Sequence, residues 1–431
     1  MTPTDILTAH SAEFRKEVIN VAPGVHVAVG FAASNIAMVE TTAGLVIVDT
    51  SESTTAAENV RAEFRKISSA PVHTIIITHG HRDHLSGIRV FCEGGTPEIV
   101  ARANLHNELT PPKAGLAPTQ VLVKRAARQF GIPLAAHSER INIGIGPADR
   151  PIAGLGEGFM PPTRTFAGDG LDLEIGGERF ELRAAPGESP DHMFVWMPAR
   201  KLLFAADNFY KSFPNLYAIR GTAYRDFNIW AGTVERLHAL GAEVMCLGHG
   251  RPMIGAAAIA GALADYRDAI RHVVAETVKG MNAGLTPDEL VQAVRLPPSL
   301  ATKPHLVEYY GMVAFAVRAY FAGTMGWFDG NPTTLQPLSP RAQAERFAAL
   351  AGGKERLFEH LQAATDDPQW ALQLADLVIQ LGRHADAARR IKAEALVKLA
   401  ERQFNAPARN YYLTYAKELR EALATPAEDR P

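Results

Sequence analysis

The sequence predicts an α/β layered domain followed by an all-α domain. In the first half, patterns typical of strands alternate with a helical pattern, and a histidine cluster directly follows a β-branched run. After Pro252 almost every segment has helical periodicity. We therefore expect a mixed α/β domain over residues 1–255, a helical domain over residues 256–424 and a tail over residues 425–431.

The composition is that of a globular protein, with 47% hydrophobic and 21% charged residues among 431. A formal net charge of -2 argues against nucleic acid or an anionic membrane as a partner. No apolar stretch has the length of a membrane helix, and the start lacks the apolar core of a signal peptide. Cys92 and Cys246 are expected to be reduced thiols. These observations favour a soluble cytoplasmic protein.

The order of elements in the first quarter is typical of a layered α/β fold. Residues 24–31 and 34–50 read as short strands, and residues 55–67 have apolar side chains at helical spacing. The β-branched run Thr74–Thr78 then leads into the histidines. The histidines should therefore lie at the carboxyl end of a buried strand, where such folds place their ligands.

Residues 93–165 are rich in Gly and Pro and contain one expected helix, at 119–131. We interpret this segment as a long excursion that covers the site. Strand patterns return in three places, at 171–188, 192–207 and 243–250.

The helical half contains one segment, residues 369–403, whose pattern predicts a pair of antiparallel helices. A single pair is not a repeat array. This half is therefore expected to serve oligomerisation or scaffolding.

The run His79-Gly-His81-Arg-Asp83-His84 predicts a metal site. On an extended segment His79 and His81 point the same way, and Asp83 and His84 can supply further ligands as the chain turns. Imidazole nitrogen and carboxylate oxygen together suit zinc, with iron or manganese less favoured. The alternative is a set of surface histidines in a turn.

Three distant residues are candidates for the remaining ligands. Glu188, Asp207 and His249 each close an apolar run, which places them at the rim of a sheet. Glu188 is equally compatible with a turn carboxylate or a helix cap. Asp207 and His249 are the stronger candidates.

The histidine run, followed by Asp207 and His249, resembles the ordered ligand motifs of the metallo-β-lactamase superfamily. Most members carry histidine where this chain has Glu188, and glutamate there is similar to the bacterial alkylsulfatases, which cleave sulfate esters with a zinc pair. The resemblance extends over about residues 25–419. It implies an αββα sandwich as the catalytic domain, followed by an alkylsulfatase-type dimerisation domain.

The resemblance also implies a ligand set for two zinc ions per chain. The ligands of one ion are His79, His81 and Glu188. The ligands of the other are Asp83, His84 and His249, and Asp207 bridges the pair. Asp83 and Asp207 would thus also take part in catalysis.

Further residues of the resemblance concern the substrate. Asn215 and Arg220 fall where the family grips the sulfate oxygens, and Tyr217 flanks the same loop. Arg220 provides a planar charged fork suited to tetrahedral oxyanions. The alternatives are a surface salt bridge for Arg220, a turn residue for Asn215 and packing for Tyr217.

The leading hypothesis is a dimeric dizinc hydrolase that cleaves sulfate esters of alkyl alcohols through a metal-bound hydroxide. The resemblance leads us to expect two departures from the family that argue against a long-chain detergent: no further sterol-carrier-like domain, and residues 129–131 in place of a tyrosine-containing segment. The alternatives are hydrolysis of a phosphotriester, lactone, thioester or β-lactam, and a mononuclear-iron or non-catalytic protein acting in redox chemistry or as an oligomeric scaffold.

Overall fold

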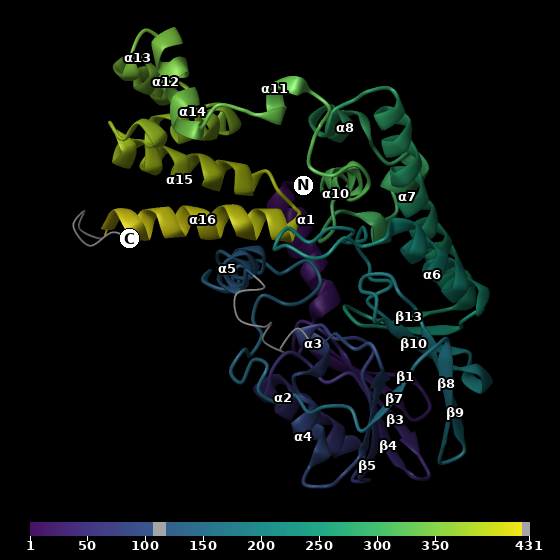
Figure 1. Cartoon of the computed structure of the whole chain (residues 1–431). Coiled ribbons are helices and arrows are strands. Elements are labelled where there is room, and N and C mark those ends of the chain that lie inside the picture. Colours follow the sequence, from purple (N-terminus) through teal and green to yellow (C-terminus); the bar gives the residue numbers. More distant parts are fainter. Residues whose placement is uncertain (107–117, 425–431) are drawn as a thin grey trace.

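The structure is a computed structural model that describes residues 1–106 and 118–424. The tail predicted for residues 425–431 lies outside the described residues. Two β-sheets pack face to face in the lower half of Figure 1, and helices cover their outer faces and form the upper half.

The first sheet has seven strands in sequence order, antiparallel up to the fourth and parallel from there on. These strands are β1 Glu17–Ala22, β2 Val25–Val29, β3 Ile36–Thr41, β4 Gly44–Val48, β5 Val72–Ile76, β6 Glu98–Arg102 and β7 Arg164–Phe166. The segment 34–50 forms the hairpin β3–β4. Strands β6 and β7 lie within the excursion that the sequence predicted to be irregular, so two ordered strands there extend the sheet.

The second sheet has the order β13-β12-β11-β10-β9-β8, with one parallel pair between β11 and β12. Its strands are β8 Gly170–Ile175, β9 Glu178–Ala184, β10 Met193–Met197, β11 Leu202–Ala206, β12 Val244–Leu247 and β13 Met253–Ile254. The strand patterns predicted at 171–188 and 192–207 each contain two antiparallel strands.

The core has three layers of apolar side chains because the central strands are buried on both faces. In β4, Val46 and Val48 face the second sheet, whereas Leu45 and Ile47 pack under outer helices. The helices of this half are α1 Pro3–His10, η1 Ser11–Phe14, α2 Thr54–Ile67, α3 Arg82–Leu85, α4 Ile88–Cys92, α5 Thr119–Gln129, η2 Pro198–Arg200 and α6 Phe227–Ala239. Helices α2 to α4 cover the first sheet, and α6 with the helix after β13 covers the second. This is the αββα sandwich.

From Ala256 onwards the described chain is helical. Its elements are α7 Ala256–Asn282, α8 Pro287–Ala293, α9 Pro298–Ala301, η3 Pro304–Leu306, α10 Val313–Met325, α11 Pro332–Leu335, α12 Pro340–Leu350, α13 Lys354–Ala363, α14 Pro368–Leu381, α15 Ala385–Glu401 and α16 Ala406–Ala424. Helices α14 and α15 form the pair predicted for residues 369–403.

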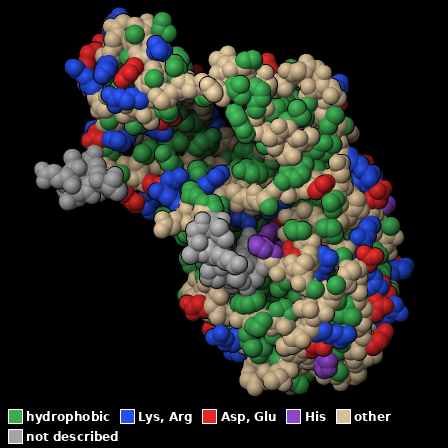
Figure 2. All heavy atoms as spheres, viewed as in Figure 1, with side chains coloured by type: hydrophobic (Ala, Val, Ile, Leu, Met, Phe, Trp, Pro, Cys, Tyr) green, Lys and Arg blue, Asp and Glu red, His purple; other side chains and the backbone are tan. Residues whose placement is uncertain are grey.

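Apolar side chains remain exposed in the helical half. Figure 2 shows hydrophobic side chains gathered in the hollow between the lobe of α12–α16 and the helices α7 to α10. Trp327 and Leu350 are 74% and 85% exposed. Among the described residues, no helix combines the length and the apolar character that crossing a membrane requires.

Candidate metal centre

The predicted histidine run lies where β5 leaves the sheet. His79 and His81 stand on the loop after β5, and α3 begins at the next residue, so Asp83 and His84 occupy its first turn. Gly80 is required between the histidines because a Cβ atom there would lie 1.8 Å from the carbonyl oxygen of His106. The local chain thus brings four donor side chains to one rim of the sandwich.

The distant candidates reach the same rim from the second sheet. Asp207 follows β11, where Ala206 adopts a left-handed φ of 49° and the register with β12 shifts. His249 follows β12, and the intervening Gly248 leaves room for the Asp207 carboxylate, since a Cβ at Gly248 would lie 2.0 Å from its Oδ1 atom. Backbone strain of this kind is concentrated at functional sites.

Asp207 is central to the cluster. Its Oδ2 atom lies 3.1 Å from Nε2 of His249, 3.3 Å from Nε2 of His84 and 3.6 Å from Nε2 of His79. The carboxylate is buried, and its other oxygen has no hydrogen-bond partner. A buried carboxylate that touches three imidazoles suits a bridging ligand.

The Nδ1 atoms of three of the imidazoles have partners behind the cluster. Nδ1–H of His249 donates to the Ala33 carbonyl (2.8 Å), and Nδ1–H of His84 donates to Asp49 (2.8 Å). The Thr78 hydroxyl donates to Asp49, so its oxygen accepts from Nδ1–H of His79 (3.0 Å). Partners of this type fix the tautomer of metal-ligating histidines. The Nε2 atoms of these rings face the centre of the cluster, where Nε2 of His79 lies 2.9 Å from Nδ1 of His81 and Nε2 of His249 lies 3.1 Å from Asp207.

Within residues 1–106 and 118–424, three groups of side chains have donor atoms close enough to share an ion. The groups are His79, His192 and Asp207; Asp83, His84 and His249; and His81, Glu188 and Asp207. The second group is the set expected for one ion. The set expected for the other ion is divided between the first and third groups, which share Asp207.

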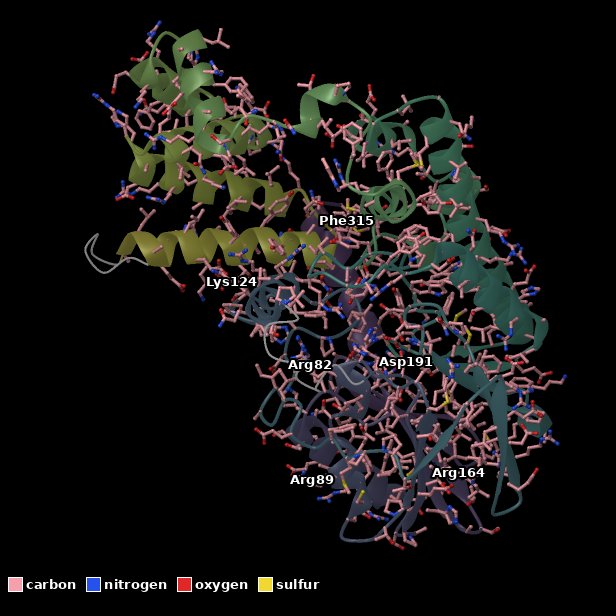
Figure 3. The ribbon with its side chains drawn as sticks, viewed as in Figure 1. Arg82, Arg89, Lys124, Arg164, Asp191 and Phe315 are labelled. Atoms are coloured by element: carbon pink, nitrogen blue, oxygen red, sulfur yellow. The ribbon has the colours of Figure 1, made fainter. Side chains whose placement is uncertain are left out.

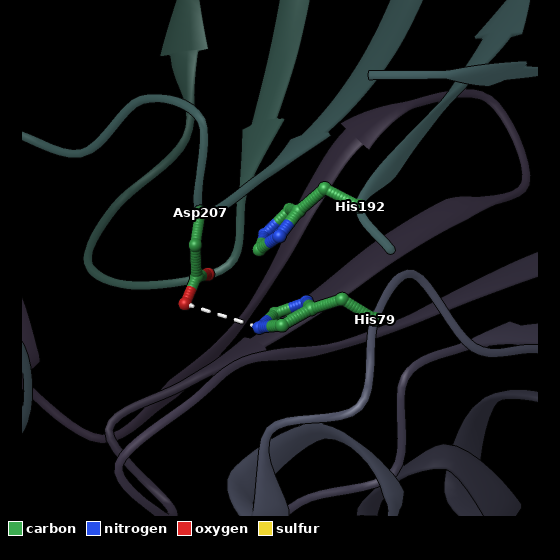
Figure 4. Close-up of side chains that lie close together, drawn as sticks. All are labelled: His79, His192 and Asp207. Carbon is green, nitrogen blue, oxygen red and sulfur yellow. Dashed lines mark ion pairs between the residues drawn. The ribbon is translucent and has the colours of Figure 1, made fainter. Parts of the chain in front are cut away.

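His192 was not predicted from the sequence. Its ring is fully buried and stacks on that of His79, with centroids 3.7 Å apart, and both rings face Asp207 (Figure 4). Its Nδ1 atom lies 2.7 Å from the Ser189 hydroxyl, and its Nε2 atom has no partner. Near-parallel stacked rings are poorly directed at a single ion, so this geometry favours His192 as packing against a ligand. The only signal in the sequence is its place four residues after Glu188.

Two carboxylates behind the cluster were also missed. Asp49 follows β4 and accepts hydrogen bonds from His84 and from the backbone and hydroxyl of Thr78. Asp191 accepts from the backbone N–H groups of Gly80 and His106, both within 2.9 Å. The place of Asp49 at the end of an apolar strand is a signal that could have identified it.

Glu188 has a strong counter-ion. Nη1 of Arg225 donates to Oε1 of Glu188 at 2.5 Å, and both side chains are buried. Burial raises the pKa of Glu188, and the Arg225 charge opposes that shift. Neither alternative proposed for Glu188, a turn carboxylate or a helix cap, requires such a partner.

The electrostatics of the cluster are those of a site built for cations. Burial and the neighbouring imidazoles hold the pKa of His79 well below its usual value. Although burial opposes it, Asp207 raises the pKa of His249 to about 9, and the His249 and His84 rings lower the pKa of Asp207. Such opposed shifts arise when acids and bases crowd together without water. The donor set of imidazole nitrogen and carboxylate oxygen therefore fits zinc.

Two adjoining cavities open onto the cluster. We call the space of about 240 Å³ that contacts Asp83, Asp207 and His249 the inner cavity, and the space of about 850 Å³ beyond it the outer cavity. In Figure 3, Arg82 and Asp191 lie between the sheets below and the helices above. The apolar lining of the inner cavity consists of Ala33, Val123, Ala126, Ala127, Phe130, Ile132, Ile143, Ile145, Ile152, Leu155 and Tyr310.

The candidate substrate residues are placed differently from one another. Arg220 lines both cavities. Asn215 is buried, and its backbone N–H donates to the Tyr210 hydroxyl at 2.6 Å. Asn215 and the half-buried Tyr217 are not in the lining of either cavity, so contact with substrate stays a prediction for both.

Comparisons with known proteins give the family. Residues 29–249 match the model of the metallo-beta-lactamase superfamily, and residues 286–422 match that of alkyl sulfatase dimerisation. The chain is 38% identical to a linear primary-alkylsulfatase of Pseudomonas sp. (strain ATCC 19151), over 89% of this chain and 73% of that one. It is 28% identical to an (R)-specific secondary-alkylsulfatase of Pseudomonas sp., over 95% of this chain and 63% of that one.

Solved structures agree on the fold. The stereoselective inverting sec-alkylsulfatase Pisa1 from Pseudomonas sp. superimposes with a TM-score of 0.83 at 24% identity, over 96% of this chain and 66% of that one. A double mutant of the same enzyme gives a TM-score of 0.84 at 25% identity, over 94% of this chain and 66% of that one. The chain spans 62% to 73% of the length of the four alkylsulfatases that it matches among curated proteins.

Proposed function

This chain belongs to the metallo-beta-lactamase superfamily and, within it, to the alkylsulfatases, and from that premise we propose that it hydrolyses sulfate esters of alkyl alcohols with a pair of zinc ions. The observation that carries the proposal is the cluster around Asp207, buried at one end of a cavity whose other walls are mostly apolar, with Arg220 among the few charged side chains. An ester with a charged head and an alkyl tail matches this arrangement, because the head can lie at the polar cluster and the tail along the apolar lining.

The residues present fit two ions that share Asp207. Asp83, His84 and His249, whose donor atoms lie within reach of a single ion, would hold one. His79, His81 and Glu188, which are divided between the two groups that contain Asp207, would hold the other. When bound, such a pair supplies activated water at neutral pH and positive charge beside the ester. The finer points of this assignment, zinc rather than iron or manganese and two ions rather than one, are part of the proposal.

The remaining chemistry falls to the chain's own side chains. Arg220 reaches the cavities with a charged, planar donor group that suits the sulfate oxygens. When the C–O bond of the ester breaks, sulfate leaves as a weak base, so for that route binding the anion matters more than donating a proton to it. The apolar lining excludes water from the alkyl part and favours its burial.

We also propose that the protein works as a homodimer through the helical domain, residues 256–424. The supporting observations are the match of residues 286–422 and the exposed Trp327 and Leu350 in that region. Sedimentation of the purified protein should give about twice the mass of one chain. The cytoplasmic location stays a prediction from the sequence.

The test is a panel of esters with the zinc-loaded protein. We expect release of inorganic sulfate from linear alkyl sulfates, and no turnover of phosphotriesters, lactones, thioesters or β-lactams at comparable rates. Metal content should be two zinc per chain. Turnover of a phosphotriester without sulfate release would refute the substrate class, and one iron per chain would refute the metal assignment.

A further inference from the structure

Helix α5 joins three parts of the molecule that are far apart in the sequence. One face lines the cavities through Val123, Ala126 and Ala127. Another contacts the loop that carries Arg220, and a third packs on α16, the last described helix of the chain. In Figure 1, α5 lies directly below α16.

The contact between α5 and the Arg220 loop is made of backbone groups on the loop. The Arg220 N–H donates to Oε1 of Gln129 at 2.8 Å. The guanidinium of Arg125 donates twice to the Ile219 carbonyl, at 3.2 and 2.6 Å. Because Arg125 and Gln129 are four residues apart, they share a helix face. Two neighbouring peptide groups of the loop are thus fixed by α5.

The contact between α5 and α16 is a two-pronged ion pair. Nε and Nη2 of Arg128 donate to the carboxylate of Glu418, at 3.0 and 2.5 Å. The guanidinium also lies over the rings of Tyr415 and Tyr411, 4.5 and 5.6 Å from their centroids. The Arg128 side chain is 13% exposed. Bidentate geometry, partial burial and aromatic neighbours make this pair stronger than an ordinary surface ion pair.

Burial of apolar side chains contributes little to holding α5 in place. Among its eleven residues, all described, only the side chain of Gln129 is buried. A helix that buries so little apolar surface depends on its polar contacts for its position. A shift of α5 would carry Gln129 and Arg125 with it, and hence the Arg220 loop.

We propose that Glu418 is a positioning residue for Arg220, acting through Arg128 and α5, so that the C-terminal helix of the dimerisation region completes the substrate site. The inference rests on the proposed function for the identity of the anion that Arg220 meets. It adds to that function a dependence on a side chain about 200 positions away in the sequence, within the region that matches the dimerisation model.

The test compares Glu418→Gln and Arg128→Gln with the double variant and with a matched control, Asp376→Asn. Asp376 forms an ion pair with Lys392 between α14 and α15, in the same lobe, and is not in the lining of either cavity. Two quantities are measured in zinc-loaded protein: KM and kcat for an alkyl sulfate, and the Kd of inorganic sulfate by calorimetry.

For each single variant we expect KM and the sulfate Kd to rise together, about three- to tenfold, with kcat changed less than about twofold and zinc content unchanged. The double variant should be no worse than either single one, because both break the same contact. Asp376→Asn should match the wild type. Gln129→Met, which removes the acceptor for the Arg220 N–H, should reproduce the rise in sulfate Kd without altering the Arg128–Glu418 pair.

The proposal is overturned if Glu418→Gln behaves as Asp376→Asn does, if the effects of the two single variants add, or if zinc content and kcat fall in parallel with binding. Wild-type protein that fails to bind inorganic sulfate also overturns it. Wild-type protein that binds sulfate but cleaves no alkyl sulfate refutes the proposed function, and the calorimetric comparison still decides on Glu418.

Discussion

The metal-binding side of the inner cavity and the wall opposite it differ in how firmly the fold holds them. His79, Asp207 and His249 are almost entirely buried just after strands of two packed sheets, and the equally buried His84 lies on α3 beside them. The wall contributed by α5 has one buried side chain and is held by hydrogen bonds and an ion pair. We infer that the firmly held metal-binding side carries out the chemistry and that the weakly anchored α5 wall recognises the substrate.

The largest effect should come from the centre of the rigid side. Asp207→Asn keeps the shape of the side chain but removes the charge that three imidazoles face. Substituting a residue that only orients a metal ligand typically lowers activity roughly 10- to 100-fold, and we expect a larger loss for Asp207→Asn. The variant should also bind fewer than two zinc ions per chain. Asp172→Asn, an exposed carboxylate on β8, is the control and should leave activity and metal content unchanged. Full zinc content in Asp207→Asn would show that Asp207 is not a ligand.

A smaller effect should follow from the residue that orients a ligand. Asp49 accepts from Nδ1–H of His84 and from Thr78, and an amide at that position cannot accept from all three donors. Asp49→Asn should weaken zinc binding about 10- to 100-fold, measured by competition with a chelator. An unchanged affinity would mean that the packing of His84 alone sets its orientation.

The sequence predicts the residues of the metal site that lie close together in the chain or that end an apolar strand. It does not predict residues whose roles depend on contacts with distant parts of the chain. The donors of the histidine run are neighbours in the chain, so the turn after β5 alone brings them together. Asp207 and His249 were predicted because each ends an apolar strand. His192 and Arg225 were not, because their roles depend on a stacking contact with His79 and an ion pair with Glu188 that no local pattern encodes.

The fold shows the same limit. Long apolar runs predicted the central strands, whereas β6 and β7 are short and lie in a segment rich in Gly and Pro. Helix α5 was predicted from the sequence, but its partner Glu418 is 290 positions from Arg128 in the chain. Hydrophobic patterns along the sequence predict elements that bury an apolar face of their own. They do not predict how an element is positioned by polar groups that are distant in the chain.

The wall can be probed by adding volume to it. Ala126 lines both cavities, so Ala126→Leu should narrow the path of the alkyl tail while keeping helix propensity. We expect KM for a long alkyl sulfate to rise about tenfold, with little change for a short one. Lys124→Met, on the exposed side of α5 and labelled in Figure 3, is the control. Equal losses for short and long substrates would place the tail elsewhere.

The smallest predicted effect is a change in stability with pH. It should arise where α1 contacts the segment that carries Ile143 and Ile145, two residues in the lining of the inner cavity. His10 is buried, stacks on Tyr309 with centroids 3.7 Å apart, and contacts the Gly144 carbonyl at 2.9 Å. Burial lowers its pKa from 6.5 to about 4, although the Gly144 carbonyl favours the charged form. The unfolded chain therefore binds a proton below pH 6.5 that the folded chain takes up only near pH 4.

The contribution of neutral His10 to the free energy of unfolding is thus complete above pH 6.5. As the pH falls towards 4, the free energy of unfolding decreases by up to about 3 kcal/mol because of this residue. His10→Phe keeps the stacking and loses the hydrogen bond, which costs about 1 kcal/mol near pH 7. Thermal unfolding of both proteins from pH 8 to 4 should show the wild type more stable at neutral pH and the variant more stable near pH 4. Because the buried ligand histidines are common to both proteins, only the difference reports on His10. Parallel curves would mean that His10 is not held neutral and that this side of the cavity does not respond to acid through α1.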